Sequence, residues 1–383
     1  MEQGLKSKRI PAVFMRGGTS KGILFHRDDL PADRAEWDAL FLSVMGSPDR
    51  HGRQLNGMGG GISSLSKVCI VGPPSRPDAD VDYTFAQVMV NEARVDYSGN
   101  CGNMSSAIGP FAVAEGLLPA SGSATVVRIH NTNTGKIIHS AFSVTDGEAD
   151  VAGDLEIPGV SGYGAPIRLD FVDPGGATTG KLLPTGSVID QLDIPGVGPV
   201  EASMVDAANA CVFVNAATLG LTGTELPEAI GRNGSLLEKL NDIRTHASVA
   251  MGITPDLAAA RAKRLVPFVG FVSPAQDADT LSGVRIEAAA VDLTARMISN
   301  GQPHLALPLT ASLCMAVAAA IEGSVVHRVA KSSGQNGLRV GMPSGVLTVG
   351  ADVGRDGGKW LARRGSFYRT ARRLFDGYVY PAV

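Results

Sequence analysis

Apolar residues occur along this chain in short runs that glycine and polar loops interrupt, a pattern that predicts many brief strands and few helices. The first runs, residues 10–15 and 23–25, flank a glycine loop, and further strands are predicted at residues 67–71 and within 81–96. From Pro31 to Gly46 the apolar positions recur every three or four residues, which predicts an amphipathic helix that Gly46 ends. Its predicted buried face consists of Trp37, Leu40, Phe41, Val44 and Met45.

Two helices are predicted to be apolar on all sides, at residues 104–118 and 311–321. Helices without a polar face are usually buried on most sides. Gly109 and Pro110 lie inside the first helix, where we expect a kink or a local 3₁₀ turn. Both helices follow strands and a polar loop, and the segments Met104–Gly116 and Ala311–Gly323 both end in Glu-Gly. This repetition favours two similar halves of one α+β fold.

We therefore expect two domains, residues 1–185 and 186–383, with the last strands free to pack back on the first domain. The stretch Pro174–Gly186, rich in glycine, proline and threonine, is our candidate for the crossing, and a surface loop is the alternative. Strands wrapped on one buried helix, used twice, place a ligand cleft between two lobes.

Composition narrows the function classes. The chain has 383 residues, 44% of them hydrophobic, and a formal net charge of −3, which excludes a broadly basic nucleic-acid surface. No apolar run approaches the length of a membrane span, and the N-terminus lacks the apolar core of a signal peptide. The four cysteines are far apart and form no CxxC pair, so we expect neither a zinc ribbon nor a disulfide scaffold, and a reducing cytoplasmic location.

The segment Gly99–Asn103 carries the sharpest chemical signal. It places the Cys101 thiol at the start of the first apolar helix, where unpaired N–H groups favour thiolate and other anions. The other interpretation is a structural cysteine at a turn. The remaining cysteines, Cys69, Cys211 and Cys314, lie within apolar runs and are interpreted as buried.

Lys67 follows the glycine loop of residues 57–61 and begins a predicted strand. Desolvation among apolar neighbours favours the neutral amine, which is the form that can act as a base. The residues alone leave a solvated lysine on an edge strand equally open.

The loop Arg16–Gly22 combines glycines with hydroxyls and two cations. It lacks the spacing of a P-loop and precedes a strand, so a cradle for carboxylates is the better functional interpretation. A plain glycine turn with solvated charges is the alternative. A third small-residue turn, Gly341–Gly345, carries no chemistry by itself.

Taken together, these motifs resemble the PrpF family. The resemblance rests on RGGTSKG, GGGISSLSK, GNCGN, NTNTG, SNGQPH with its apolar helix, and GMPSG, and it spans nearly the whole chain. The family includes 2-methylaconitate cis-trans isomerase, 4-oxalomesaconate tautomerase and methylitaconate delta-isomerase.

The resemblance implies a diaminopimelate epimerase-like fold with two pseudo-symmetric domains, each a β-barrel around a central helix. It also implies a cofactor-independent isomerase that shifts a proton and a double bond in an unsaturated di- or tricarboxylate, without metal or nucleotide. Lys67 matches the family's catalytic lysine and Cys101 its active-site cysteine. Residues expected to bind the substrate are Arg16, Thr19, Ser20, Lys21, Ser64, Asn100, Gly102, Asn103, Thr310, Ser344 and Gly345.

Two alternatives stay open at this point. An amino-acid epimerase of the same fold needs two opposed thiols, and the second half offers Thr310 or Ser312 at the equivalent helix start, with Cys314 a turn deeper. A non-catalytic carboxylate-binding protein is the other alternative. The expected partner is a small polycarboxylate, with no nucleic acid and no membrane, and a homodimer is left open.

Overall fold

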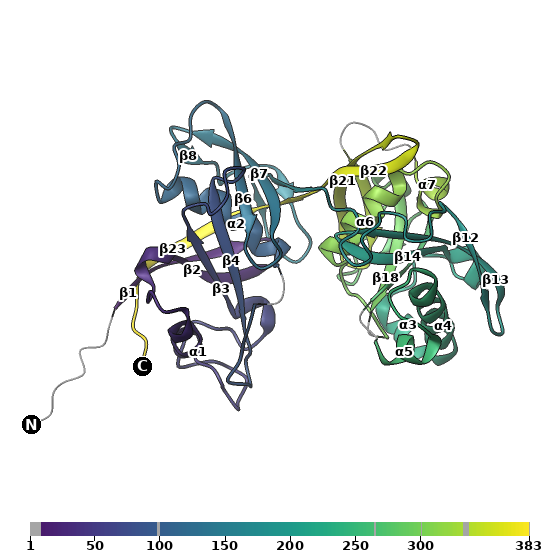
Figure 1. Cartoon of the computed structure of the whole chain (residues 1–383), viewed down its shortest axis with the longest axis horizontal. Helices are drawn as coiled ribbons and strands as arrows, with labels where there is room; N and C mark the ends of the chain where they lie inside the picture. The colour runs from purple at the N-terminus through teal and green to yellow at the C-terminus, as the bar shows by residue number, and fades with distance from the viewer. Residues whose placement is uncertain (1–8, 98–99, 264–265, 300, 332–336, 383) are drawn as a thin grey trace, which may run out of the picture. The chain divides into compact units, whose positions relative to one another are not determined.

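The chain folds into two compact units in a computed structural model that describes residues 9–97, 100–263, 266–299, 301–331 and 337–382 (Figure 1). Unit 1 comprises Met1–Asp170 and Tyr368–Val383, and unit 2 comprises Phe171–Phe367. Unit 2 begins upstream of the predicted boundary after residue 185, and the last strand belongs to unit 1.

Unit 1 is a mixed sheet with two α-helices among its described residues. Its longer elements are β1 (Ile10–Gly17), β2 (Ser20–His26), α1 (Trp37–Met45), β3 (Lys67–Gly72), β4 (Val81–Val88), α2 (Gly102–Ala114), β6 (Ala124–Asn131), β7 (Lys136–Thr145), β11 (Ile167–Val172) and β23 (Ala371–Val379). Its short elements are η1 (Arg27–Asp29), η2 (Arg34–Glu36), η3 (Ser63–Leu65), β5 (Val95–Asp96), β8 (Glu148–Ala149), β9 (Leu155–Glu156) and β10 (Tyr163–Gly164).

The helices of unit 1 cover opposite faces of the sheet. Side chains of a strand alternate between its two faces. Ile23, Phe25, Val68 and Ile70 pack with α1 in one hydrophobic cluster. The intervening residues of β2, β3 and β4 therefore face the other side, which α2 occupies, as the ring contact of His26 with Phe111 of α2 shows.

The apolar helix α2 is buried, as the sequence predicts. Met104–Val113 are all buried among the strands of unit 1. The helix continues through Pro110 without the expected 3₁₀ turn and ends at Ala114, before Gly116 with its positive φ. A Cβ on Gly109 would lie 2.7 Å from the Ser140 hydroxyl, so this glycine allows β7 to approach the helix closely.

Unit 2 holds the second half of the elements. They are β12 (Asp190–Ile194), β13 (Gly198–Ala207), β14 (Asn209–Asn215), η4 (Ala216–Leu219), α3 (Pro227–Arg232), α4 (Gly234–Ala250), α5 (Leu257–Ala262), β15 (Phe268–Pro274), β16 (Ala278–Asp279), β17 (Arg285–Ile286), η5 (Ala288–Ala290), β18 (Leu293–Ser299), β19 (Gln302–Pro303), α6 (Leu309–Ala320), α7 (Val325–Val329), β20 (Leu338–Met342), β21 (Gly345–Asp356) and β22 (Lys359–Arg369).

Strand pairing follows the same order in both units. In unit 1, β1/β2 is antiparallel, β2/β3 parallel, β3/β4 antiparallel, β4/β6 parallel and β6/β7 antiparallel. In unit 2, β13/β14, β14/β15, β15/β18, β18/β20 and β20/β21 repeat these directions in turn. The buried helices α2 and α6 follow corresponding strands. This repetition agrees with the two similar halves expected from the sequence.

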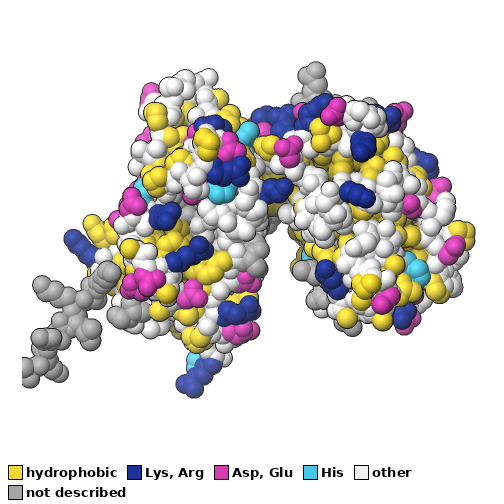
Figure 2. All heavy atoms as spheres, viewed as in Figure 1, with side chains coloured by type: hydrophobic (Ala, Val, Ile, Leu, Met, Phe, Trp, Pro, Cys, Tyr) yellow, Lys and Arg dark blue, Asp and Glu magenta, His cyan; other side chains and the backbone are white. Residues whose placement is uncertain are grey.

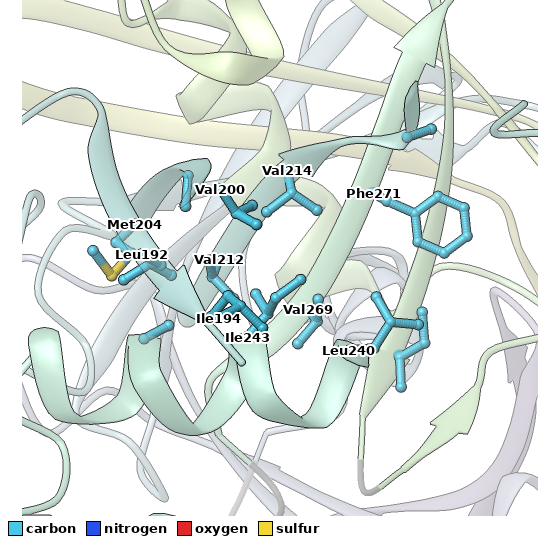
Figure 3. Close-up of a cluster of buried hydrophobic side chains, with 14 of the residues drawn as sticks. Leu192, Ile194, Val200, Met204, Val212, Val214, Leu240, Ile243, Val269 and Phe271 are labelled. Atoms are coloured by element: carbon cyan, nitrogen blue, oxygen red, sulfur yellow. The ribbon is translucent and has the colours of Figure 1, made fainter. Parts of the chain in front are cut away.

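A hydrophobic cluster in unit 2 takes the place of the cluster under α1. Figure 3 shows Leu240 and Ile243 of α4 packed against Val212, Val269 and Phe271 of the sheet. The opposite face of this sheet meets α6, whose residues Ala311–Ala318 are buried. Each unit is therefore a sheet between a surface helix and a buried one.

The glycine-rich stretch 174–186 folds as a loop of unit 2, the alternative that the sequence left open. Asp206 of β13 holds it, because one carboxylate oxygen accepts from the main-chain N–H groups of Thr178 and Thr179, at 2.8 and 2.6 Å. Helix α1 begins at Trp37, after η2, and not at Pro31; Gly46 ends it in the left-handed conformation, as predicted.

Surface features match the composition. Both signs of charge appear on the visible face of each unit in Figure 2, in keeping with a net charge of −3. None of the helices described is long and apolar enough to cross a membrane.

Gly22 provides a test of the close packing of β2 on β3. Its ideal Cβ would lie 2.6 Å from the Lys67 carbonyl oxygen and 3.1 Å from the Lys67 Cβ. We expect Gly22→Ala to destabilise the protein by about 1–3 kcal/mol, as overpacked sites do, and to lower its thermal midpoint. Gly234→Ala is the control, because nothing lies within 4 Å of its Cβ. Equal midpoints for the two variants would contradict this account of Gly22.

Candidate active site

Strand alternation brings several polar and aromatic side chains of unit 1 onto the face that meets α2. Lys67 and Cys69 of β3 lie on this face, since Val68 and Ile70 between them pack with α1. Tyr83, Phe85 and Gln87 of β4 lie on it for the same reason. The register pairs Lys67 with Gln87 across β3 and β4. The sheet therefore gathers these five residues beside the buried helix.

Lys67 is held by side-chain contacts with β4. It is 8% exposed, and its Nζ lies 2.6 Å from Gln87 Oε1 and 5.0 Å from the centre of the Phe85 ring. On the β2 side its partner in the register is Gly22, which has no side chain to compete for this space. Lys67 is thus a buried amine on an inner strand, and the alternative of a solvated edge lysine is excluded.

Cys101 is the residue that precedes the first turn of α2. It is half-buried, with an extended backbone, and its carbonyl accepts the Ser105 N–H at 2.9 Å. Its side chain lies within electrostatic range of the Cys69 thiol and the Tyr83 hydroxyl. Lys67 and Cys101 both act on Cys69, because Cys101 raises the pKa of that thiol and Lys67 lowers it.

Burial distinguishes the other thiols from Cys101. Desolvation raises the pKa of Cys69 and the pKa of Tyr83, and the Cys69 thiol donates to the Tyr83 hydroxyl oxygen at 3.8 Å. In unit 2, desolvation and the neighbouring Cys314 raise the pKa of Cys211. These buried groups therefore stay protonated at neutral pH.

The N-terminal glycine loop meets the start of α2. A Cβ on Gly17 would lie 2.6 Å from the Asn103 carbonyl oxygen, so only glycine permits this approach. Asn103 Nδ2 donates to Thr19 Oγ1 at 3.1 Å, and Asn103 Oδ1 accepts the Thr19 N–H at 3.4 Å. Two residues predicted to bind substrate, 84 positions apart, are thus in contact.

Arg369 fixes the orientation of Asn103. Its Nε donates to Asn103 Oδ1 at 3.1 Å, and burial lowers the pKa of the guanidinium to about 10. Because Oδ1 receives this charged donor, Nδ2 is left to donate to Thr19. The Thr19 hydroxyl then accepts from Asn103 and keeps its own proton for a ligand. Sequence reasoning missed Arg369, which lies 266 residues from Asn103.

Arg16 stabilises the loop through hydrogen bonds to main-chain carbonyl oxygens. Its guanidinium donates to the carbonyl oxygens of Gly18 at 2.9 Å and Thr370 at 2.8 Å, and burial lowers its pKa. Ser20 is buried, and Lys21 lies 5.8 Å from the centre of the Phe14 ring. Of this loop, Thr19 is the residue with an exposed side chain.

Asn100 and Ser64 complete the predicted residues of unit 1. Asn100 Oδ1 accepts from Ser105 Oγ at 3.1 Å and from Asn131 Nδ2 at 3.4 Å, which ties the loop before α2 to β6. Ser64 lies half-buried in η3, three residues before Lys67 in the sequence. Gly99 lies outside the described residues.

Two polar side chains whose contacts sequence reasoning missed, Gln54 and Asn133, hydrogen-bond to the segments around Lys67. Gln54 Oε1 accepts from the Gly61 N–H at 2.9 Å and from Ser66 Oγ at 2.6 Å, so the second glycine loop wraps this glutamine. Asn133 donates to the carbonyl of Phe85 and accepts its N–H at 2.7 Å. The NTNTG motif therefore positions β4.

Thr310, Ser344 and Gly345 belong to unit 2. Thr310, in the first turn of α6, accepts from Asn209 Nδ2 at 3.5 Å. Ser344 and Gly345 form the turn between β20 and β21, and the Ser344 hydroxyl is buried without a hydrogen-bond partner among the residues described. By strand register, Phe268 stands where Lys67 stands in unit 1, and Pro308 precedes α6 as Cys101 precedes α2.

The described residues gather no group of three or more His, Cys, Asp and Glu side chains that could hold a metal ion. The site of unit 1 instead offers an amine, a thiol, an amide and a hydroxyl around the start of a helix. This set can transfer protons and bind anions.

Comparison with known proteins identifies the family. The PrpF protein family matches residues 7–382, and the chain belongs to it, which confirms the resemblance seen in the motifs. It is 43% identical to 3-methylitaconate isomerase of Eubacterium barkeri over 97% of both chains. It is 41% identical to 2-methyl-aconitate isomerase of Cupriavidus necator, covering 97% of this chain and 96% of the relative.

Solved structures agree with this assignment. The crystal structure of a methylitaconate-delta-isomerase superimposes with a TM-score of 0.91 at 43% identity, covering 98% of this chain and 96% of that chain. The chain is an isomerase, as are these relatives.

The cysteines allow a direct test of the cluster. Iodoacetamide near neutral pH should label Cys101 first, because it is half-buried at a helix start while burial keeps the Cys69 and Cys211 thiols protonated. Mass spectrometry of the labelled peptides measures the order. Labelling of Cys69 ahead of Cys101 would contradict the site.

Thr19 allows a test of the anion-binding contacts. Thr19→Val keeps the shape and removes the hydroxyl that Asn103 orients. We expect KM for an anionic substrate to rise about tenfold, the value of one hydrogen bond to a charged group, with a smaller change in kcat. Thr224→Val in unit 2 is the matched control. An unchanged KM for Thr19→Val would remove this residue from binding.

Proposed function

We propose that this chain isomerises an unsaturated di- or tricarboxylate by moving a proton and a double bond, without a cofactor. The observation that supports this most is the buried Lys67, which is held by a neutral amide and acts on the same Cys69 thiol as Cys101 at the start of α2. The relatives supply the substrate class, since their names refer to methylitaconate, methylaconitate and 4-oxalomesaconate.

The reaction begins with removal of a proton from carbon. Neutral Lys67 takes the proton from the carbon gamma to a conjugated carboxylate or keto group, and the electron pair of that C–H bond moves into the conjugated system. The dienolate carries its charge on the carboxylate or keto oxygens. A proton returned at the other end of the allylic system completes the shift and restores the charges.

Stabilisation of the dienolate is the main requirement, because the C–H acid is weak. The first turn of α2, from Gly102 and Asn103, presents main-chain N–H groups and the positive end of the helix dipole. The Thr19 hydroxyl, oriented by Asn103, adds a neutral donor for a carboxylate. These groups are fixed by packing before the substrate binds, which is the condition for effective electrostatic catalysis.

Two proton donors are compatible with this site. Lys67 becomes an ammonium after the first step and can return the proton itself, or the Cys101 thiol can deliver it. If Cys101 is the acid, Cys101→Ser should lose most of kcat, because a serine hydroxyl is a far weaker acid. If Cys101 only shapes the anion pocket, KM should change and kcat should persist.

An amino-acid epimerase of the same fold is the second candidate, and the structure disfavours it. That mechanism needs a thiol from each half. Pro308 occupies the position before α6, and Cys314 is fully buried, with its Sγ 3.3 Å from the Val205 carbonyl oxygen.

We further propose the two-domain, diaminopimelate epimerase-like fold, and we propose that Thr310, Ser344 and Gly345 bind substrate. A homodimer and a cytoplasmic location stay predictions.

Lys67→Met tests the base. We expect exchange of substrate C–H with D₂O, followed by proton NMR on methylitaconate, methylaconitate and 4-oxalomesaconate, to fall by a factor of about 10²–10⁴, the usual contribution of a general base. Substrate binding, measured by calorimetry, should persist. Lys359→Met at the exposed start of β22 is the control. Full turnover in Lys67→Met would remove the lysine from the mechanism. If the unmodified protein turned over none of these polycarboxylates, the alternative of a non-catalytic carboxylate-binding protein would be favoured.

A further inference from the structure

The side-chain amide of Gln87 has one orientation. Its Nε2 lies 3.1 Å from the Ser63 carbonyl oxygen, 3.0 Å from that of Ser66 and 3.3 Å from that of Val88. Carbonyl oxygens only accept hydrogen bonds, so the NH₂ end must face them. The Oε1 end is therefore directed at Lys67 Nζ, 2.6 Å away.

This contact restricts the directions available to the lysine nitrogen. A neutral amine has two N–H bonds and one lone pair. In this form, which the proposed base requires, one N–H donates to Gln87 Oε1, and the Phe85 ring, 5.0 Å from Nζ, presents its negative face to the other. The lone pair is left for the remaining direction.

The titratable groups on this face are Cys69 on the same strand, Tyr83 on β4 and Cys101 at the start of α2. His26 of β2, which is paired with Glu115, and Asp96 of β5, which lies opposite Gln87 in the register, are on it as well. The register partner on β2 is Gly22, which adds none. No carboxylate forms a salt bridge with Lys67 in the part of the chain described. The partner that contacts the amine is thus the uncharged amide of Gln87.

We propose that Gln87 is a positioning residue that aims the lone pair of Lys67 and keeps the amine free of a carboxylate counter-ion. The proposal rests on the proposed role of Lys67 as base. A glutamate at this position would stabilise the ammonium and place negative charge against three carbonyl oxygens. An apolar side chain would remove the acceptor that orients the amine.

Two substitutions separate these effects, because they act on the amine in opposite directions. In Gln87→Glu the carboxylate favours the ammonium, so the pH at which Lys67 becomes half reactive should rise by about one unit or more. In Gln87→Met the ammonium loses its acceptor, so this midpoint should fall while kcat also falls, about tenfold. If Gln87 had only a structural role, the Lys67 midpoint would stay unchanged in both variants.

Competitive labelling with acetic anhydride measures the midpoint without any substrate, because only the neutral amine reacts. The extent of acetylation at Lys67 is followed by mass spectrometry across pH, against added N-acetyl-lysine amide as internal standard. The pH dependence of kcat/KM for the isomerisation is recorded in parallel, and its acidic limb should shift with the labelling midpoint in each variant.

Gln276→Glu is the matched control. Gln276 Nε2 also donates to a main-chain carbonyl, that of Thr222, and to Ser273 Oγ, but it lies in unit 2. Its substitution should leave the Lys67 midpoint unchanged. Should Gln87→Glu not fold, judged by circular dichroism, Gln87→Met decides alone.

Identical Lys67 midpoints in the unmodified protein and in the folded Gln87 variants would overturn the proposal. Shifted midpoints together with full turnover in Lys67→Met would instead contradict the proposed function and leave the Gln87 contact intact. The two failures are therefore distinguishable.

Discussion

The cross-strand pair of Lys67 and Gln87 is the contact on which the proposed chemistry of unit 1 depends. A lysine on an inner strand is costly unless its nitrogen has a partner, and a charged partner would hold it as an ammonium. Here the partner of the nitrogen is the neutral amide of Gln87. The sheet supplies this partner through register, since Lys67 and Gln87 are opposite residues of β3 and β4.

The buried helix α2 imposes the second constraint. Strands contact its sides, and Gly17 allows the N-terminal loop to pack directly against the Asn103 carbonyl of its first turn. The same turn then carries Cys101, the helix N–H groups and the Asn103 amide. The glycines around this turn therefore allow its close packing, and under the proposed function the same turn binds the anionic substrate.

Much of this fold follows from local patterns. The face of α1, its end at Gly46, and the two apolar helices are visible in the sequence because each depends on residues within one or two turns. Lys67 and Cys101 stand out through their glycine and asparagine neighbours. The partners that define their chemistry do not, since the Gln87 contact depends on strand register and the Arg369 contact joins residues at opposite ends of the chain. Neither leaves a periodic signal.

The comparison of the two units explains which reaction this arrangement suits. Strand directions repeat throughout, yet the lysine position of unit 1 is Phe268 in unit 2, and the cysteine position is Pro308. An epimerase inverts a single carbon and needs acid–base groups on its two opposite sides, so both halves must keep a thiol. An allylic shift takes a proton from one carbon and returns one to another, and a single amine can serve both steps on one side of a planar intermediate. A repeated fold with its amine and accessible thiol in one half therefore matches the isomerase chemistry better than the epimerase chemistry.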